Sequence, residues 1–264
     1  MAASLKIVSI HLFFFIFTRK SHKKVLASIM HRWCRNVTSI LRVRIETTYA
    51  AQFHEMNFLL VANHQSYFDI VVIGSVFPTL FLAKKEVQHW PIIGLLATLV
   101  GTLFIDRRAF RGAVTSVQEI CEALHEGASV QIFPEGTSTD GSCILPFKPS
   151  LMKAAVDAYA TILPVTINYR YINDELFSVE NRDIICWYGD MEFGNHFWKL
   201  LNQDSIEVSL SVHAPIRPPH PISIQELTQS VYEKVSSNFL GVEEKQVNEN
   251  IRTTTREVFS SLSV

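Results

Sequence analysis

The chain has 264 residues, of which 48% are hydrophobic and 11% aromatic, with a mean hydropathy of +0.16. This composition suffices for one large α/β domain and excludes a mainly disordered, coiled-coil or collagen-like protein. The formal net charge of −1 conceals an uneven distribution: residues 1–45 hold nine Lys or Arg and no acid, whereas the rest holds 15 basic and 25 acidic groups. The basic leader indicates contact with an anionic surface, and the acidic remainder argues against nucleic acid as that surface.

An apolar run, Ile7 to Phe17, lies within this leader and is followed by a basic stretch at 18–24. Eleven helical residues reach about 17 Å against a bilayer core of about 30 Å, so interfacial insertion is favoured over a full span or a buried helix. A signal peptide is disfavoured because no small-residue cleavage site follows the run. From Val25 to Leu41 apolar residues recur every three or four positions with Lys and Arg between them. This pattern predicts a basic amphipathic helix on the cytoplasmic face of a membrane, in a monotopic or amino-terminally anchored protein.

From Asn57 onward, β-rich runs alternate with helical patterns. Strands are predicted at 58–62, 79–83, 102–105, 130–133, 162–169, 184–187 and 206–212, and helices at 109–125, 150–159 and 223–239. The alternation predicts an α/β fold with a mixed, partly parallel sheet flanked by helices. The charge-free run 87–105 favours a core helix followed by a buried strand over a membrane span. We expect a membrane-associated segment at 1–45, the main domain at 46–242 and a polar tail at 243–264.

Several familiar chemistries lack their motifs in this sequence. The four cysteines are widely spaced with no C-x-x-C pair, which indicates reduced and mostly buried thiols in a cytosol-facing protein and not a zinc knuckle or dithiol site. There is no G-x-S-x-G, no P-loop, no G-x-G-x-x-G and no H-E-x-x-H. Nucleotide hydrolysis, Rossmann redox chemistry and zincin chemistry therefore lose their usual support.

A histidine and a carboxylate follow the first predicted strand of the main domain, as His64 and Asp69 in the segment N-H-Q-S-Y-F-D. Strand ends are where α/β proteins place reactive groups. A carboxylate that holds one ring nitrogen fixes the tautomer and stabilises the imidazolium, so the pair can act as a general base worth about 10²–10⁴ in rate. Alone it is a weak signal, because an isolated histidine is more often structural.

Two further constellations end predicted strands. The segment G-T-L-F-I-D-R-R at 101–108 finishes in Arg107 and Arg108, which suit an anion but could also be a solvated surface pair. The segment I-F-P-E-G-T-S at 132–138 contains a turn at which Gly136 allows close backbone approach and Glu135 offers a hydrogen-bond acceptor.

In this order and spacing, N-H-x-S-x-x-D, G-x-x-F-I-D-R and F-P-E-G-T resemble the motifs of the PlsC-like glycerolipid acyltransferases, typified by bacterial 1-acylglycerol-3-phosphate O-acyltransferase. The A-K-K-E segment at 83–86 and Leu163-Pro164-Val165 match further motifs, and the resemblance covers about 57–171. It implies a membrane-bound enzyme that moves a fatty acyl group from acyl-carrier protein or acyl-coenzyme A to the hydroxyl of a lysolipid. The default acceptor is 1-acyl-sn-glycerol-3-phosphate, giving phosphatidic acid in phospholipid biosynthesis, and no metal or cofactor is expected beyond the thioester co-substrate.

The resemblance also implies roles for individual residues. His64 would be the base and Asp69 its orienting partner, with direct attack on the thioester and no acyl-enzyme. The acceptor and its anionic head would be bound by Lys84, Arg107, Glu135, Gly136 and Thr137, with Asn63, Ser66, Gly101 and Pro164 in support.

One position departs from the family pattern. Many lysophosphatidate enzymes continue F-P-E-G-T with Arg, whereas this chain has Ser138. Loss of a guanidinium weakens the case for a doubly charged phosphate monoester as the acceptor. The continuation T-S-T-D-G at 137–141 resembles the lyso-ornithine-lipid and general lysophospholipid branch of the family, which implies another lysolipid as the alternative acceptor. The aromatic stretch from Trp187 to Trp198 could line an acyl tunnel, meet the membrane interface or belong to the core.

Two functions of other classes remain as alternatives. A catalytically silent lipid-binding protein is disfavoured because such a protein has no chemical need for His64, Asp69, Arg107 and Glu135 together. A hydrolase would use the same base to activate water and would release free fatty acid without an acceptor.

Overall fold

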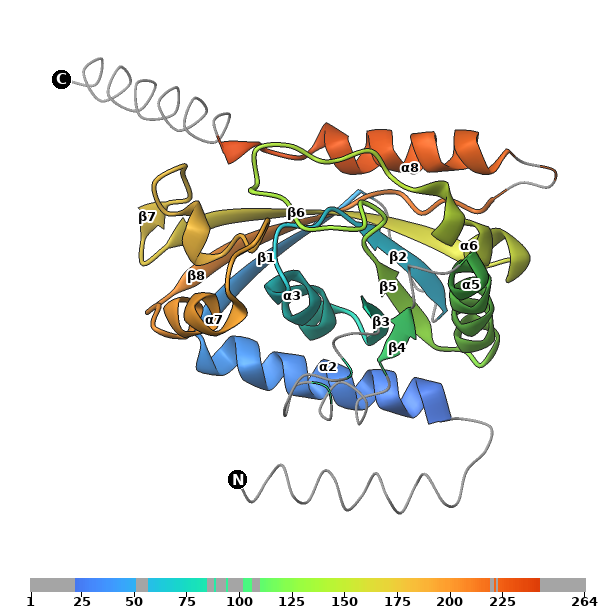
Figure 1. Cartoon of the computed structure of the whole chain (residues 1–264), viewed down its shortest axis with the longest axis horizontal. Coiled ribbons are helices and arrows are strands. Elements are labelled where there is room, and N and C mark those ends of the chain that lie inside the picture. Colours follow the sequence, from blue (N-terminus) through green and yellow to red (C-terminus); the bar gives the residue numbers. More distant parts are fainter. Residues whose placement is uncertain are drawn as a thin grey trace.

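The sheet is mixed, as the sequence predicts (Figure 1). The computed structural model describes residues 22–50, 57–84, 88, 94, 102–105, 110–218, 221 and 223–242. Within this part of the chain, eight strands form a sheet of order β1-β8-β6-β2-β5-β3-β4, with β7 paired to β6. Strands β2 to β6 are parallel, β8 is antiparallel to β6, and β1 is parallel to β8. The strands are β1 Val43–Tyr49, β2 Phe58–Ala62, β3 Thr79–Lys84, β4 Leu103–Ile105, β5 Ser129–Ile132, β6 Thr161–Ile172, β7 Glu175–Leu176 and β8 Ile206–Val212.

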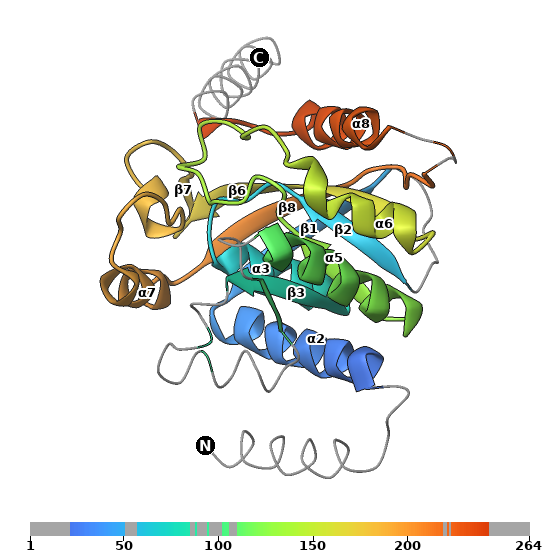
Figure 2. The ribbon, with the colours of Figure 1, turned by 45° about the vertical axis from the view of Figure 1, so that its right-hand side comes forward.

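Helices cover both faces of the sheet (Figures 1 and 2). They are α2 His22–Ile40, α3 Phe68–Val76, α5 Phe110–His125, α6 Lys153–Asp157, α7 Phe193–Leu201 and α8 Ile224–Ser237, with 3₁₀ turns η2 at Pro149–Leu151 and η3 at Arg182–Ile184. Helices α5, α6 and α8 lie on one side, and α3, with α2 beyond it, lies on the other.

Strand β2 shows why both faces must be covered. All five of its residues are buried, and alternate side chains point to opposite faces of a strand. Leu60 packs into one cluster with Val72 of α3, and Leu59 packs into a second with Ile120 of α5 and Val231 of α8. A strand that is apolar on both sides is typical of a parallel sheet between two helical layers.

Helix α2 buries one of its sides against the rest of the fold. Leu26, Ala27, Met30 and Cys34 are buried, and the helix packs against α3 and β3. Arg32 and Arg35 are exposed on the other side. The basic helix is thus part of the folded body, and the boundary expected at residue 45 falls inside β1. Among the described residues, no helix combines the length and apolarity that a membrane crossing requires.

The structure confirms most of the predicted elements and corrects one. The helices near 109–125 and 223–239 are α5 and α8, and the pattern at 150–159 is divided between η2 and α6. The strand predicted at 184–187 is wrong: Cys186 N donates to the Arg182 carbonyl in a helical turn. Ile185 and Cys186 are buried, which accounts for an apolar run at 184–186. A short apolar run of this kind occurs in buried turns as well as in strands, so the sequence pattern alone does not distinguish them.

Helices α3 and α7 and strands β1 and β7 are additional to the elements that the sequence predicts. The expectations for the run 7–17 and the tail 243–264 lie outside the described residues, as does most of 87–101; the strand at its end is β4.

Candidate active site

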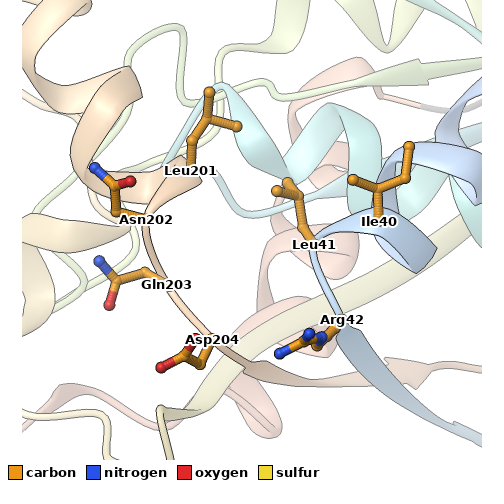
Figure 3. Close-up of a pocket in the computed structure, with 7 residues that line it drawn as sticks. All are labelled: Ile40, Leu41, Arg42, Leu201, Asn202, Gln203 and Asp204. Carbon is orange, nitrogen blue, oxygen red and sulfur yellow. The ribbon is translucent and has the colours of Figure 1, made fainter.

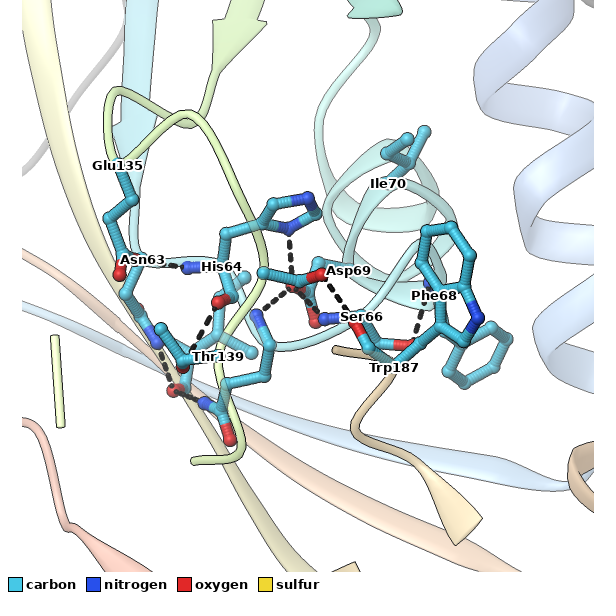
Figure 4. Close-up of polar contacts among 12 residues, drawn as sticks. Asn63, His64, Ser66, Phe68, Asp69, Ile70, Glu135, Thr139 and Trp187 are labelled. Carbon is cyan, nitrogen blue, oxygen red and sulfur yellow. Dashed lines mark hydrogen bonds and ion pairs between the residues drawn. The ribbon is translucent and has the colours of Figure 1, made fainter. Parts of the chain in front are cut away.

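The histidine segment N-H-x-S-x-x-D and the F-P-E-G-T segment meet at one edge of the sheet (Figure 4). Strand β2 ends at Ala62 and leads into His64, and its parallel neighbour β5 ends at Ile132 and leads into Glu135. The carboxyl ends of parallel strands lie at the same edge, so segments about 70 residues apart in the chain become adjacent. Pro164 lies in register with Val61 on the other neighbour, β6.

His64 and Asp69 form the hydrogen-bonded pair that their spacing predicts. His64 Nδ1 lies 2.9 Å from Asp69 Oδ2. Since a carboxylate only accepts hydrogen bonds, Nδ1 carries the hydrogen and Nε2 has its lone pair available. Within the described residues, Nε2 makes no hydrogen bond. The ring stacks on Phe133, with centroids 4.2 Å apart and planes 11° apart.

Asp69 is completely buried and accepts four hydrogen bonds. Oδ2 also accepts from Gln65 N at 2.7 Å and Ser66 N at 2.9 Å, and Oδ1 accepts from the Tyr169 hydroxyl at 2.6 Å. Donors on both oxygens compensate for the loss of water around a buried carboxylate. The carboxylate is therefore held in a fixed orientation toward the imidazole.

Glu135 holds the backbone of the histidine segment. Its Oε1 accepts from His64 N at 2.6 Å and its Oε2 from Leu145 N at 2.7 Å. Burial raises the pKa of Glu135 to about 8, against the effect of these two N–H donors. Thr139 also connects this loop to the histidine segment, because its backbone N and its hydroxyl both donate to the His64 carbonyl.

The expected supporting residues in this region have structural contacts. The Asn63 side chain exchanges two hydrogen bonds with the backbone of Ile167 on β6. The Ser66 hydroxyl accepts from Phe68 N at the start of α3. Together they fix the segment that carries His64 between a strand and a helix.

The turn after β5 presents one cation. Gly136 has a φ of +80°, and a Cβ built there would lie 2.6 Å from the Lys148 ammonium nitrogen. Thr137 is exposed at the turn. The Ser138 hydroxyl donates to the Trp187 carbonyl and so points into the protein framework. Lys148 makes no ion pair with an acid in the part of the chain that the structure describes.

No contact among the described residues tests any of the predicted acceptor-binding roles, because those roles concern a bound lipid. Arg107 and Gly101 lie outside the described residues. Lys84 ends β3, in register with Ile105 of β4, and its place beside the acceptor stays a prediction.

The sequence assigned no individual role to Phe133, although it begins the F-P-E-G-T segment, and none to Lys148 or Tyr169. No local pattern marks Tyr169, because it meets Asp69 across 100 residues of chain. The aromatic stretch after Trp187 also contacts this edge: the Tyr67 hydroxyl lies 2.9 Å from His196 Nδ1, and its ring lies beside Trp187 and Phe193.

A surface hollow lies elsewhere, between the ends of α2 and α7 (Figure 3). Its lining residues are Ile40, Leu41, Arg42, Leu201, Asn202, Gln203 and Asp204. None of them is hydrogen-bonded to His64 or Asp69 in the described structure, so the hollow is separate from the strand-end site.

The chain matches a protein-family model described as Acyltransferase over residues 41–168. It is 32% identical to the lyso-ornithine lipid O-acyltransferase of Brucella abortus over 224 residues, which cover 82% of each chain. It is 36% identical to the 1-acyl-sn-glycerol-3-phosphate acyltransferase of Neisseria meningitidis over 174 residues, 66% of each chain. The chain belongs to the acyltransferase family.

A solved structure agrees with this assignment. The crystal structure of the 1-acyl-sn-glycerophosphate acyltransferase PlsC from Thermotoga maritima aligns with a TM-score of 0.63 and 25% identity, over 92% of this chain and 91% of that one. The protein is an enzyme of lipid metabolism that acylates lysolipids.

Proposed function

We propose that this acyltransferase uses His64 as a general base to transfer an acyl group from a thioester, on acyl-carrier protein or coenzyme A, to a lysolipid hydroxyl. The acceptor hydroxyl donates to Nε2, which takes its proton as the oxygen attacks the thioester carbonyl. The tetrahedral intermediate then collapses, the carbon–sulfur bond breaks, and the imidazolium returns the proton to the leaving thiolate. His64 is therefore regenerated at the end of the cycle. This proposed mechanism uses the thioester as the activated acyl donor and includes no metal or cofactor.

The observation that carries this proposal is the orientation of His64. Asp69 accepts a hydrogen bond from His64 Nδ1, and Phe133 stacks on one face of the imidazole. In the neutral ring, Nε2 then carries the lone pair. The His64 side chain is 18% exposed, whereas that of Asp69 is fully buried. A base with one accessible nitrogen and a buried orienting partner fits proton abstraction from a bound hydroxyl.

For the acceptor, we propose a lyso-ornithine-type lipid, whose head carries a carboxylate and an ammonium in place of a doubly charged phosphate, ahead of lysophosphatidate. Ser138 replaces the family's arginine and is bonded to the Trp187 carbonyl, so it does not face a ligand as a cation would. Lys148, beside Gly136, supplies one positive charge as a compact ammonium. The name of the Brucella relative agrees with this choice.

The amino-terminal region suggests where the reaction occurs. We propose that the enzyme works on the cytoplasmic surface of an anionic membrane, with the exposed face of α2 toward the lipid. Arg32 and Arg35 on that face support this placement.

The test is a detergent assay that offers each labelled acyl thioester with lyso-ornithine lipid, lysophosphatidate, other lysophospholipids or no acceptor. We expect acyl transfer by the wild type and a loss of at least about 10² in kcat for His64→Ala, because the base is removed. His125→Ala, at an exposed histidine of α5, is the matched control. Lys148→Gln should raise KM for the preferred acceptor more than it lowers kcat.

Other outcomes identify other functions. Free fatty acid formed without an acceptor would indicate a hydrolase, and no turnover by folded protein with any pair would indicate a lipid-binding role. Near-normal turnover of His64→Ala would remove the base assignment. Preference for lysophosphatidate would overturn the acceptor proposal alone.

A further inference from the structure

A tyrosine on the long strand β6 reaches the buried side of the His64–Asp69 pair. Tyr169 is fully buried, and its hydroxyl donates to Asp69 Oδ1 at 2.6 Å. Strand β6 extends past the end of β2, whose last residue pairs with Val165. The extension places Tyr169 beside the first turn of α3, where Asp69 lies.

The phenol has a specific reason to be in this core. Its ring packs near Phe177, with centroids 5.8 Å apart, so a phenylalanine would serve the packing alone. Burial and the neighbouring Asp69 carboxylate raise the pKa of Tyr169 well above its usual value. The hydroxyl thus keeps its proton and acts as a donor.

The two oxygens of Asp69 have different partners. Oδ2 receives His64 Nδ1 and the backbone N–H groups of Gln65 and Ser66. Oδ1 receives Tyr169, and no other donor to it is found among the described residues. Without the Tyr169 hydroxyl, Asp69 Oδ1 would lose a hydrogen bond inside the core. That hydrogen bond both fixes the orientation of the carboxylate and stabilises its negative charge.

We propose that Tyr169 is a positioning residue that fixes the Asp69 carboxylate and sets how strongly it supports His64 as the base. The inference rests on the proposed function of His64. Removing the phenol has two effects of known direction. A less constrained carboxylate orients the imidazole less well, which lowers kcat. A carboxylate with more charge on Oδ2 stabilises the imidazolium more, so the acid limb of the pH–activity profile moves to higher pH.

Tyr169→Phe tests this in the full-length enzyme with its preferred acceptor. We expect kcat to fall about 10-fold with little change in acceptor KM, and the acid limb of kcat/KM to move up by roughly half a pH unit. Tyr232→Phe is the matched control, because Tyr232 packs on Phe147 in the other core cluster, and its profile should match the wild type.

Three results would overturn the inference. An unchanged kcat and profile would show that the phenol has no role in the reaction. A lower kcat or lower thermal stability with an unmoved acid limb would show that Tyr169 only packs the core. If His64→Ala retains normal turnover, the proposed function fails as well. If His64→Ala is inactive while Tyr169→Phe behaves as the wild type, only this inference fails.

Discussion

Glu135 shows how a residue of the family motif can act on the backbone. Both its oxygens accept backbone N–H groups, from His64 and Leu145, so it joins the histidine segment to the loop after the F-P-E-G-T turn. The family resemblance implies that Glu135 binds the acceptor, and in the structure its described contacts are within the protein. Its direct contact with an acceptor stays a prediction.

The raised pKa of Glu135 predicts a pH-dependent stability. Between an ordinary value of 4.5 and about 8, the folded protein holds a proton on Glu135 that the unfolded chain has lost. The free energy of unfolding should therefore fall as pH rises through this range, by up to about 1.4 kcal/mol per pH unit from this group. Glu135→Gln should remove this slope in urea titrations at pH 5, 6, 7 and 8.

The same urea titrations include a control variant and can contradict the prediction. Glu175→Gln, at an exposed position of β7, should keep the wild-type slope. A Glu135→Gln curve parallel to the wild type would mean that the two N–H donors keep Glu135 ionised throughout.

At the scale of elements, the contact between α2 and α3 depends on one glycine. A Cβ at Gly74 would lie 2.7 Å from Cys34 Sγ and 3.4 Å from Cys34 Cβ, and Cys34 is fully buried. The Gly74 carbonyl also lies 2.8 Å from His31 Nδ1. The two helices approach closely because Gly74 has no side chain.

Gly74→Ala should therefore destabilise the protein by about 1–3 kcal/mol, although alanine is the better helix former. In a Cys34→Ala background the clash with sulfur is absent, so the same substitution should cost much less. Thermal unfolding of the four proteins of this cycle measures the difference. Gly194→Ala in α7, with nothing within 4 Å of the added Cβ, should be neutral or stabilising. Equal costs in both backgrounds would contradict the packing argument.

At the scale of the whole molecule, α2 and its exposed arginines lie on one outer face. Helices α2 and α8 lie on opposite faces in both views (Figures 1 and 2). Lys23 of α2 forms ion pairs with Glu122 of α5 and with Glu126 in the turn that follows α5, so its charge is partly compensated within the fold. Arg32 and Arg35 remain exposed.

Arg32→Gln/Arg35→Gln should weaken binding to anionic vesicles by about 2 kcal/mol, or roughly 30-fold, because each cation near the surface contributes about 1 kcal/mol. Co-sedimentation with phosphatidylglycerol-containing vesicles measures the change. Lys153→Gln/Lys234→Gln, which neutralises two lysines on α6 and α8, should bind as the wild type does. Equal binding of the three proteins would show that the exposed face of α2 does not meet the lipid.

Elements with a clear apolar periodicity or a clear stop signal could be predicted from the sequence. Examples are α5, which ends shortly before Gly127, and the strands β2 and β5 that precede His64 and Glu135. The sequence also determined the order of motifs that predicts the chemistry, because those signals are local. Only the folded structure reveals that the Tyr169 hydroxyl is hydrogen-bonded to Asp69 and that the Ser138 hydroxyl is hydrogen-bonded to the Trp187 carbonyl. It also decided that the chain at 184–187 is not a strand. These features depend on strand register and on which segments pack together, and neither is encoded in the spacing of neighbouring residues.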